Sequence, residues 1–158
     1  MPLTCGAAPT AVAVTASVGG LASLTLADPV EAEPNDLAAA ATPLFIGGAV
    51  RGTLIGADQV DWYRVLIPAG GVYTFETAGW YGDRCSFALD LNTTLDLLTS
   101  SQVNVTTSDD IDAANNDFCS RITATLAPGS YYLQVTRGDF FGLGPHSGRY
   151  ALWARSGP

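Results

Sequence analysis

The chain has 158 residues, of which 47% are hydrophobic and 14% are charged, and its formal net charge is −8. This length suits one domain with a substantial core, and the hydrophobic fraction argues against a disordered chain. The basic residues are all arginine, and an acidic surface repels nucleic acid and anionic lipid, so we expect neither as a partner. No apolar run reaches the length needed to span a membrane.

Residues 1–30 are predicted to form an extended N-terminal arm. From Thr10 to Val18, mainly valine positions alternate with Ala, Thr and Ser, which is the pattern of a strand. The segment lacks the basic start of a secretory signal, so we interpret it as mature sequence, or as a sequence whose true start is not shown, rather than as the poor apolar region of a leader. One face of this strand carries Val12, Val14, Ala16 and Val18.

An acidic stretch, Glu31-Ala32-Glu33-Pro34-Asn35-Asp36, follows the arm directly. Pro34 favours an extended residue before it, and Asn and Asp favour turns, so several oxygens are expected to gather around one point. Such a cluster without His or Cys favours a hard cation, and Ca²⁺ tolerates crowded oxygen ligands better than Mg²⁺ does. A second acidic pair, Asp58 and Asp61, follows further along the chain. A solvated acidic turn is the alternative interpretation of either stretch.

Beyond the acidic stretch, one helical turn within Asp36–Thr42 and a series of short strands are predicted. Turn residues such as Pro68-Ala69-Gly70-Gly71 and Ala127-Pro128-Gly129 separate the strands, which indicates an antiparallel β-sandwich. The expected strands are Ala49–Leu54, Asp61–Ile67, Val72–Thr77, Ser86–Leu91, Leu95–Leu98, Val103–Thr107, Arg121–Leu126, Ser130–Arg137 and Arg149–Ala154. The expected core residues are Phe87, Leu89, Leu91, Ile122, Ala124, Leu126, Tyr131, Leu133 and Val135.

The cysteines and the sequons both bear on the compartment. Cys85 and Cys119 lie near predicted strand ends, so we expect a disulfide between them, with Cys5 free or available to another chain. Three reduced thiols are the alternative. Sequons begin at Asn92 and Asn104 and are candidate glycosylation sites. A disulfide and sequons together favour an extracellular setting.

The order of several short motifs resembles that of the bacterial pre-peptidase C-terminal domain, a family that includes the collagen-binding domains of clostridial collagenases. The motifs are Glu-x-Glu-Pro-Asn-Asp, Gly-Thr-Leu followed by Asp-x-x-Asp-Trp-Tyr, Pro-Ala-Gly-Gly-Val-Tyr-Thr-Phe, Asn-Asn-Asp, Leu-Ala-Pro-Gly-Ser-Tyr-Tyr-Leu-Gln-Val and Gly-Arg-Tyr-Ala-Leu. The resemblance covers Glu31 to about Ala154 and departs from the family's usual Asp-Thr-x-Leu pattern around Ser86–Leu98.

The resemblance implies an all-β, jelly-roll-like sandwich that is stabilised by calcium and has no catalytic activity. We therefore divide the chain into the arm, residues 1–30, and a calcium-binding module, residues 31–158. The resemblance places Thr53 beside the ion as well, through its carbonyl oxygen. The implied calcium ligands are Glu31, Glu33, Asn35, Asp36, Thr53, Asp58 and Asp61.

An acidic loop, two aromatic pairs and the histidine each have a functional and a structural interpretation. The loop Ser108–Asp117 is acidic, but it lacks the glycine and spaced glutamate of an EF-hand, so a solvated turn is preferred to a second ion site. The pairs Trp80-Tyr81 and Phe140-Phe141 either bind glycan, peptide or a neighbouring subunit, or fold over an end of the sandwich. His146 is the only histidine, and no Gly-x-Ser-x-Gly motif accompanies it, so catalysis is not expected.

The arm decides between the functional hypotheses. An uncharged alternating strand outside a complete module can add to the sheet of another molecule, so our first hypothesis is a secreted fibre subunit that polymerises by strand donation. Pairing of the arm with its own sheet, or disorder, are the alternatives. The second hypothesis is an accessory module of a secreted hydrolase that binds collagen-like peptide or polysaccharide. The third is an enzyme that uses His146.

Overall fold

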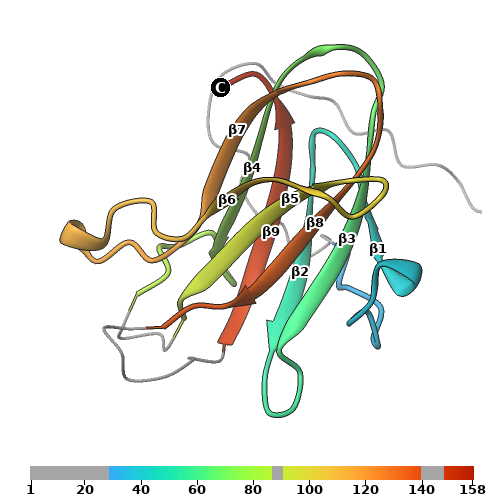
Figure 1. Ribbon diagram of the computed structural model, residues 1–158. Helices are drawn as coiled ribbons and strands as arrows, with labels where there is room; N and C mark the ends of the chain where they lie inside the picture. Colours follow the sequence, from blue (N-terminus) through green and yellow to red (C-terminus); the bar gives the residue numbers. More distant parts are fainter. Residues whose placement is uncertain (1–28, 87–90, 140–147) are drawn as a thin grey trace, which may run out of the picture.

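The computed structural model describes residues 29–86, 91–139 and 148–158, which form two β-sheets packed face to face (Figure 1). A single 3₁₀ turn, η1 (Ala38–Ala40), precedes the first strand, and another, η3 (Ala113–Asn115), lies in the loop before β7. Among the described residues, no helix has the length and apolar character that crossing a bilayer requires. The strands are β1 (Thr42–Leu44), β2 (Gly48–Leu54), β3 (Val60–Ile67), β4 (Gly71–Gly79), β5 (Thr93–Thr99), β6 (Asn104–Ser108), β7 (Arg121–Leu126), β8 (Gly129–Arg137) and β9 (Gly148–Ser156).

One sheet has the strand order β1-β3-β8-β5-β6 and the other has the order β2-β9-β4-β7. Every pair of neighbouring strands is antiparallel except β1 and β3, which run parallel with Thr42 opposite Tyr63. The expected all-β, largely antiparallel sandwich is therefore confirmed. The parallel strand β1 was not predicted, because it has three residues and contains Pro43, which cannot donate a ladder hydrogen bond.

The core lies between the sheets and follows the period-two alternation of the strands. In β3, Tyr63, Val65 and Ile67 are buried, whereas Arg64 and Leu66 are exposed. The expected core positions Leu91, Ile122, Leu126, Leu133 and Val135 are buried, and Ala124 and Tyr131 pack against the core while partly exposed. Phe87 and Leu89 lie outside the described residues, as does most of the expected strand Ser86–Leu91.

The predicted disulfide is confirmed. The sulfur atoms of Cys85 and Cys119 are bonded, with the two Cα atoms 4.8 Å apart and both side chains buried in the core. The bridge ties the segment after β4 to the segment before β7, across a sequence separation of 34 residues. Cys5 lies outside the described residues.

The chain enters the sandwich along the edge strand β2. Val30 forms a parallel bridge with Arg51, the Arg51 N–H donates to the Pro29 carbonyl at 2.9 Å, and the Glu31 N–H donates to the Arg51 carbonyl at 2.9 Å. The last residues assigned to the arm are thus paired with the body. The predicted donor strand, with Val12, Val14, Ala16 and Val18, lies outside the described residues and stays a prediction.

Candidate metal centre

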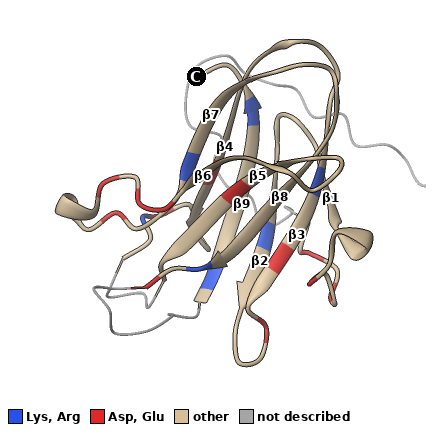
Figure 2. Ribbon diagram, viewed as in Figure 1, with Lys and Arg blue, Asp and Glu red and all other residues tan. Residues whose placement is uncertain are grey.

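Three carboxylates converge beside the start of β3. Oxygen atoms of Glu31, Glu33 and Asp61 lie within 4.8 Å of one another. Figure 2 shows this acidic group where the segment before η1 passes β3. The segment is held against β3 because the Trp62 N–H donates to the Asn35 carbonyl at 3.0 Å.

Glu31 is buried and anchored from several sides. Its Oε1 accepts the Thr53 N–H at 2.6 Å, and its Oε2 accepts the Tyr63 hydroxyl and the Asn35 side-chain amide, the latter at 3.3 Å. Thr53 contacts Glu31 through its N–H and hydroxyl groups, and the expected role of its carbonyl as a ligand of the ion stays a prediction. These donors fix the orientation of the Glu31 carboxylate.

Asn35 completes the turn that the acidic stretch predicts. Its backbone N–H donates to Glu33 Oε2 at 3.1 Å, and its Nδ2 donates to Thr42 Oγ1 at 3.3 Å. The side chain is fully buried, yet Asn35 Oδ1 has no hydrogen-bond partner. Since a buried amide oxygen without a donor is costly, this atom is available to a cation.

Two buried tyrosines hold the carboxylates and were missed by the sequence analysis. Tyr63 from β3 donates to Glu31, Tyr150 from β9 donates to Asp61, and the two hydroxyl oxygens are 2.6 Å apart. The tyrosines thereby join the two sheets at the acidic group. The signal was the tyrosine in Asp-Trp-Tyr and in Gly-Arg-Tyr, since a core tyrosine hydroxyl must find a polar partner.

Gly52 on β2 makes this arrangement fit. A Cβ atom at Gly52 would lie 2.4 Å from the Tyr150 ring and 2.6 Å from the Tyr63 hydroxyl oxygen. Any larger residue would displace both buried tyrosines, and with them the hydrogen bonds to Glu31 and Asp61. The packing therefore requires glycine here.

The electrostatics of the group are unfavourable without a counter-charge. Burial, with added repulsion from Glu31, Asp58 and Glu33, raises the pKa of Asp61 to about 9. Burial likewise raises the pKa of Glu31 and, with repulsion from Glu33 and Asp36, that of Asp58. Carboxylates that repel one another in a buried site either retain protons or bind a cation.

The donor set fits a hard cation. Besides Asn35 Oδ1, the buried atoms Asp58 Oδ1 and Asp61 Oδ1 have no hydrogen-bond partner. All the candidate ligand atoms are oxygen, which suits Ca²⁺. Asp36 is exposed, and repulsion from its charge helps to raise the pKa of Asp58.

The structure describes the acidic loop and one of the two aromatic pairs. In the acidic loop, Asp112 caps η3 by accepting the Asn115 N–H at 3.3 Å, an ordinary role that fits the solvated turn. Tyr81 is 78% exposed and Trp80 is partly buried. Phe140, Phe141 and His146 lie outside the described residues.

The asparagines of the two sequons differ in solvent exposure. Asn92 is buried. Its side-chain Nδ2 donates to the Asp139 carbonyl at 3.2 Å, and its backbone carbonyl accepts the Gly138 N–H. The folded chain leaves no room for a glycan there, so the expectation for Asn92 is wrong for the folded protein. Asn104 is exposed on β6 and remains a predicted glycosylation site.

The comparisons with known proteins support the resemblance. A model of the bacterial pre-peptidase C-terminal domain matches residues 59–137, half of the chain. The chain belongs to this family. A solved pre-peptidase C-terminal domain, that of collagenase from Bacillus anthracis, superposes with a TM-score of 0.53 at 22% identity, covering 72% of this chain and 93% of that one. At this identity the likeness shows a shared fold.

A second solved structure, a β-glucosidase from Paenibacillus barengoltzii, superposes with a TM-score of 0.35 at 15% identity, over 82% of this chain and 13% of that one, which is too weak to indicate a shared fold. No curated protein matches the chain. The matched region of this pre-peptidase C-terminal domain includes Asp61 and Tyr63, whereas Glu31 and Glu33 precede it.

Proposed function

We propose that this pre-peptidase C-terminal domain is a secreted, non-catalytic accessory module that binds Ca²⁺ at the acidic group and a polymeric ligand on its surface. The observation that carries the calcium assignment is the convergence of Glu31, Glu33 and Asp61 with unpartnered buried oxygens beside them. Glu31, Glu33, Asn35, Asp58 and Asp61 would hold the ion, which would neutralise the buried charge.

The residues around the centre explain what binding would achieve. Glu31 and Glu33 belong to the entering segment, Asp61 to one sheet, and Tyr150 to the other sheet. The tyrosine hydroxyls occupy one oxygen of Glu31 and one of Asp61, which leaves Asp61 Oδ1 without a hydrogen-bond partner and available to the ion. Calcium would thus fasten the N-terminal segment to the sandwich.

The ligand class is proposed from the family. The Bacillus anthracis structure is a domain of a collagenase, and we take an accessory module of such a secreted hydrolase to bind the polymer on which the hydrolase acts. We therefore propose collagen-like peptide or polysaccharide as the ligand. The buried Cys85–Cys119 disulfide supports an oxidising, extracellular setting.

Two measurements test this function. Isothermal titration with Ca²⁺ should show saturable binding that Asp61→Asn abolishes, and pull-down on insoluble collagen and on insoluble polysaccharides should retain the calcium-loaded protein on one of them. Asp109→Asn, which removes an exposed carboxylate from the acidic loop, is the matched control and should bind calcium normally. Failure to bind calcium, or to bind any polymer, would contradict the corresponding half of the proposal.

A fibre subunit is the second candidate, favoured by one edge of the five-stranded sheet. Edge strand β6 (Asn104–Ser108) carries no charge and no proline, the features that normally block pairing with another strand. The entering segment already pairs in extended conformation at Val30. Residues 10–18 of one copy would add to β6 of the next.

Deletion of residues 2–20 tests strand donation. If donation occurs, the full chain forms long assemblies by light scattering and electron microscopy, whereas the deleted chain is a folded monomer, because the donor strand is gone. Val14→Asp in the full chain is the companion variant and should block assembly equally. Assemblies that persist after deletion, or a full chain that is monomeric, would exclude this candidate.

A further inference from the structure

Trp80 lies over two arginines on the outer face of the four-stranded sheet. The guanidinium carbon of Arg51 is 5.3 Å from the centre of the Trp80 ring system and that of Arg149 is 5.4 Å from it. Tyr150 faces the core, so its neighbour Arg149 on β9 faces outward. These contacts are cation–π interactions, which hold the indole in one place at the end of β4.

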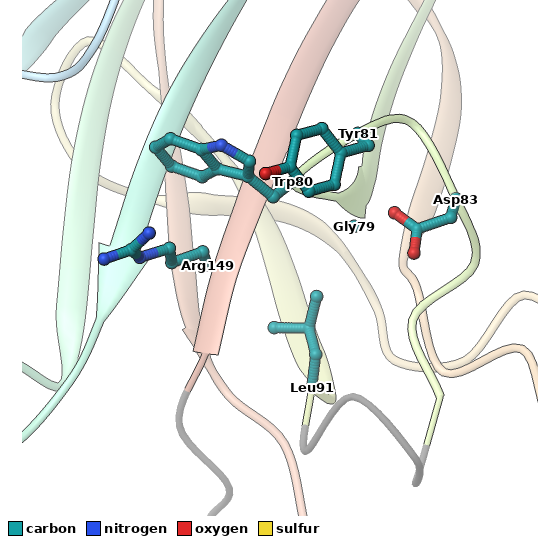
Figure 3. A pocket seen from close by; sticks show the side chains of 6 residues that line it. All are labelled: Gly79, Trp80, Tyr81, Asp83, Leu91 and Arg149. Atoms are coloured by element: carbon teal, nitrogen blue, oxygen red, sulfur yellow. The ribbon is translucent and has the colours of Figure 1, made fainter.

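A cavity of about 250 Å³ lies beside this indole (Figure 3). Figure 3 shows Arg149 and Asp83 on opposite sides of the cavity, with Trp80 and Tyr81 along one wall and Leu91 facing them. Sites for drug-sized ligands are typically about 300–1,000 Å³, so this one suits a single ring. Its lining residues are Gly79, Trp80, Tyr81, Asp83, Leu91 and Arg149.

The cation at the surface of this site is Arg149. Arg51 is only 4% exposed, whereas Arg149 is exposed and forms no ion pair with a carboxylate in the described ranges. The protein has a net charge of −8 and seven arginines, and Arg149 brings one of these few positive charges to the lining of the cavity. Arginine binds carboxylates through two parallel hydrogen bonds, which favours an anionic ligand.

The remaining lining residues select among anionic ligands. Tyr81 is 78% exposed and offers an aromatic face to the apolar C–H face of a sugar ring. The Asp83 carboxylate can accept hydrogen bonds from hydroxyl groups of the ligand. It repels any ligand carboxylate beyond the one that Arg149 binds. An acidic peptide presents carboxylates without vicinal hydroxyls, whereas a uronic acid ring presents both.

We infer that Trp80, Tyr81, Asp83 and Arg149 form a subsite for one uronic acid ring of an acidic polysaccharide. Arg149 binds the carboxylate, Asp83 accepts from ring hydroxyls, and the ring lies against the aromatic wall. The inference rests on the proposed polymer-binding function and narrows its ligand class.

The test is isothermal titration of the full chain, in calcium-containing buffer, with a soluble trimer of galacturonic acid. The same trimer with its carboxylates methyl-esterified keeps the rings and removes the charge, and it should bind at least tenfold more weakly. Polyglutamate of similar charge presents carboxylates without ring hydroxyls and should also bind at least tenfold more weakly.

Two variants and two matched controls assign the binding to this site. Arg149→Gln and Tyr81→Ala should each weaken trimer binding about tenfold or more, the order expected for a lost charge-assisted hydrogen bond or aromatic contact. Arg64→Gln removes an exposed arginine from the other sheet, and Phe45→Ala removes an aromatic side chain that is 76% exposed in another loop. Both controls should bind the trimer as the wild type does.

Equal binding of the methyl ester, equal binding of polyglutamate, or equal loss in Arg64→Gln would each overturn the inference. Calcium titration and the collagen pull-down on the same samples separate it from the proposed function. A wild type that binds calcium and collagen but not the trimer overturns the uronate subsite alone. A wild type that binds neither calcium, nor collagen, nor the trimer, nor any of the insoluble polysaccharides overturns both.

Discussion

Calcium is expected to raise the melting temperature of the folded domain by roughly 5–10 °C when the free ion is at about 100 times its dissociation constant. The ion would bind the native acidic group and not the unfolded chain, in which Glu31 and Asp61 are far apart. Scanning calorimetry or circular dichroism with calcium, and again after chelation, measures the shift. An unchanged melting temperature at every calcium concentration would rule out a structural calcium centre.

For the variant Asp61→Asn, calcium is expected to decide whether the variant or the wild type is the more stable protein. Without calcium it should be more stable than the wild type at neutral pH, because an amide avoids the cost of burying or protonating a carboxylate whose pKa is raised to about 9. The oxygen of the introduced amide can still accept the hydrogen bond from the Tyr150 hydroxyl. With calcium it should be less stable than the wild type, because a ligand is lost. The control Asp109→Asn should show the calcium response of the wild type.

The pH dependence of the chelated protein has a defined sign. The pKa of Asp61 is raised in the folded state from 3.8 to about 9, so its contribution to stability is fully present below about pH 4. That contribution is lost as the pH rises through the folded-state pKa. In chelator, the stability difference between Asp61→Asn and the wild type should therefore widen from pH 5 to pH 9, and a difference that narrows would contradict the assignment.

Removal of the Cys85–Cys119 disulfide is expected to lower the free energy of unfolding by about 3–4 kcal/mol, from the chain entropy of the loop that it closes. Denaturant unfolding of the double variant Cys85→Ala/Cys119→Ala measures the effect. Since both side chains are buried, alanine also leaves small voids, so reduction of the wild type provides an independent value.

Cys5→Ser is the control for the disulfide. It removes a thiol without touching the bridge, so its unfolding free energy should match that of the wild type, and reduction should destabilise it equally. A wild type whose stability does not change on reduction would contradict a structural role for the bridge.

The local pattern of apolar and polar residues was sufficient to predict many of the strands. The alternation in Arg121–Leu126 and Ser130–Arg137 predicts β7 and β8 because side chains two residues apart share a face, whatever the rest of the chain does. The acidic turn at Glu33–Asp36 was predictable for the same reason, since Pro34 and Asn35 act on neighbouring backbone. The cysteine pairing and the order of the family's motifs were also visible in the sequence.

Sheet packing alone decided how these parts meet. Tyr63 and Tyr150 lie on different sheets and are 87 residues apart in the chain, so no local pattern places their hydroxyls together. The same non-local register buries Asn92 beneath Gly138, adds the parallel strand β1, and brings Arg51 and Arg149 to Trp80. Local sequence was enough to indicate which face of each strand is apolar and which acids are neighbours along the chain. Contacts between distant strands decided which of those acids share one buried site, because strand register and sheet packing depend on residues that the local sequence does not contain.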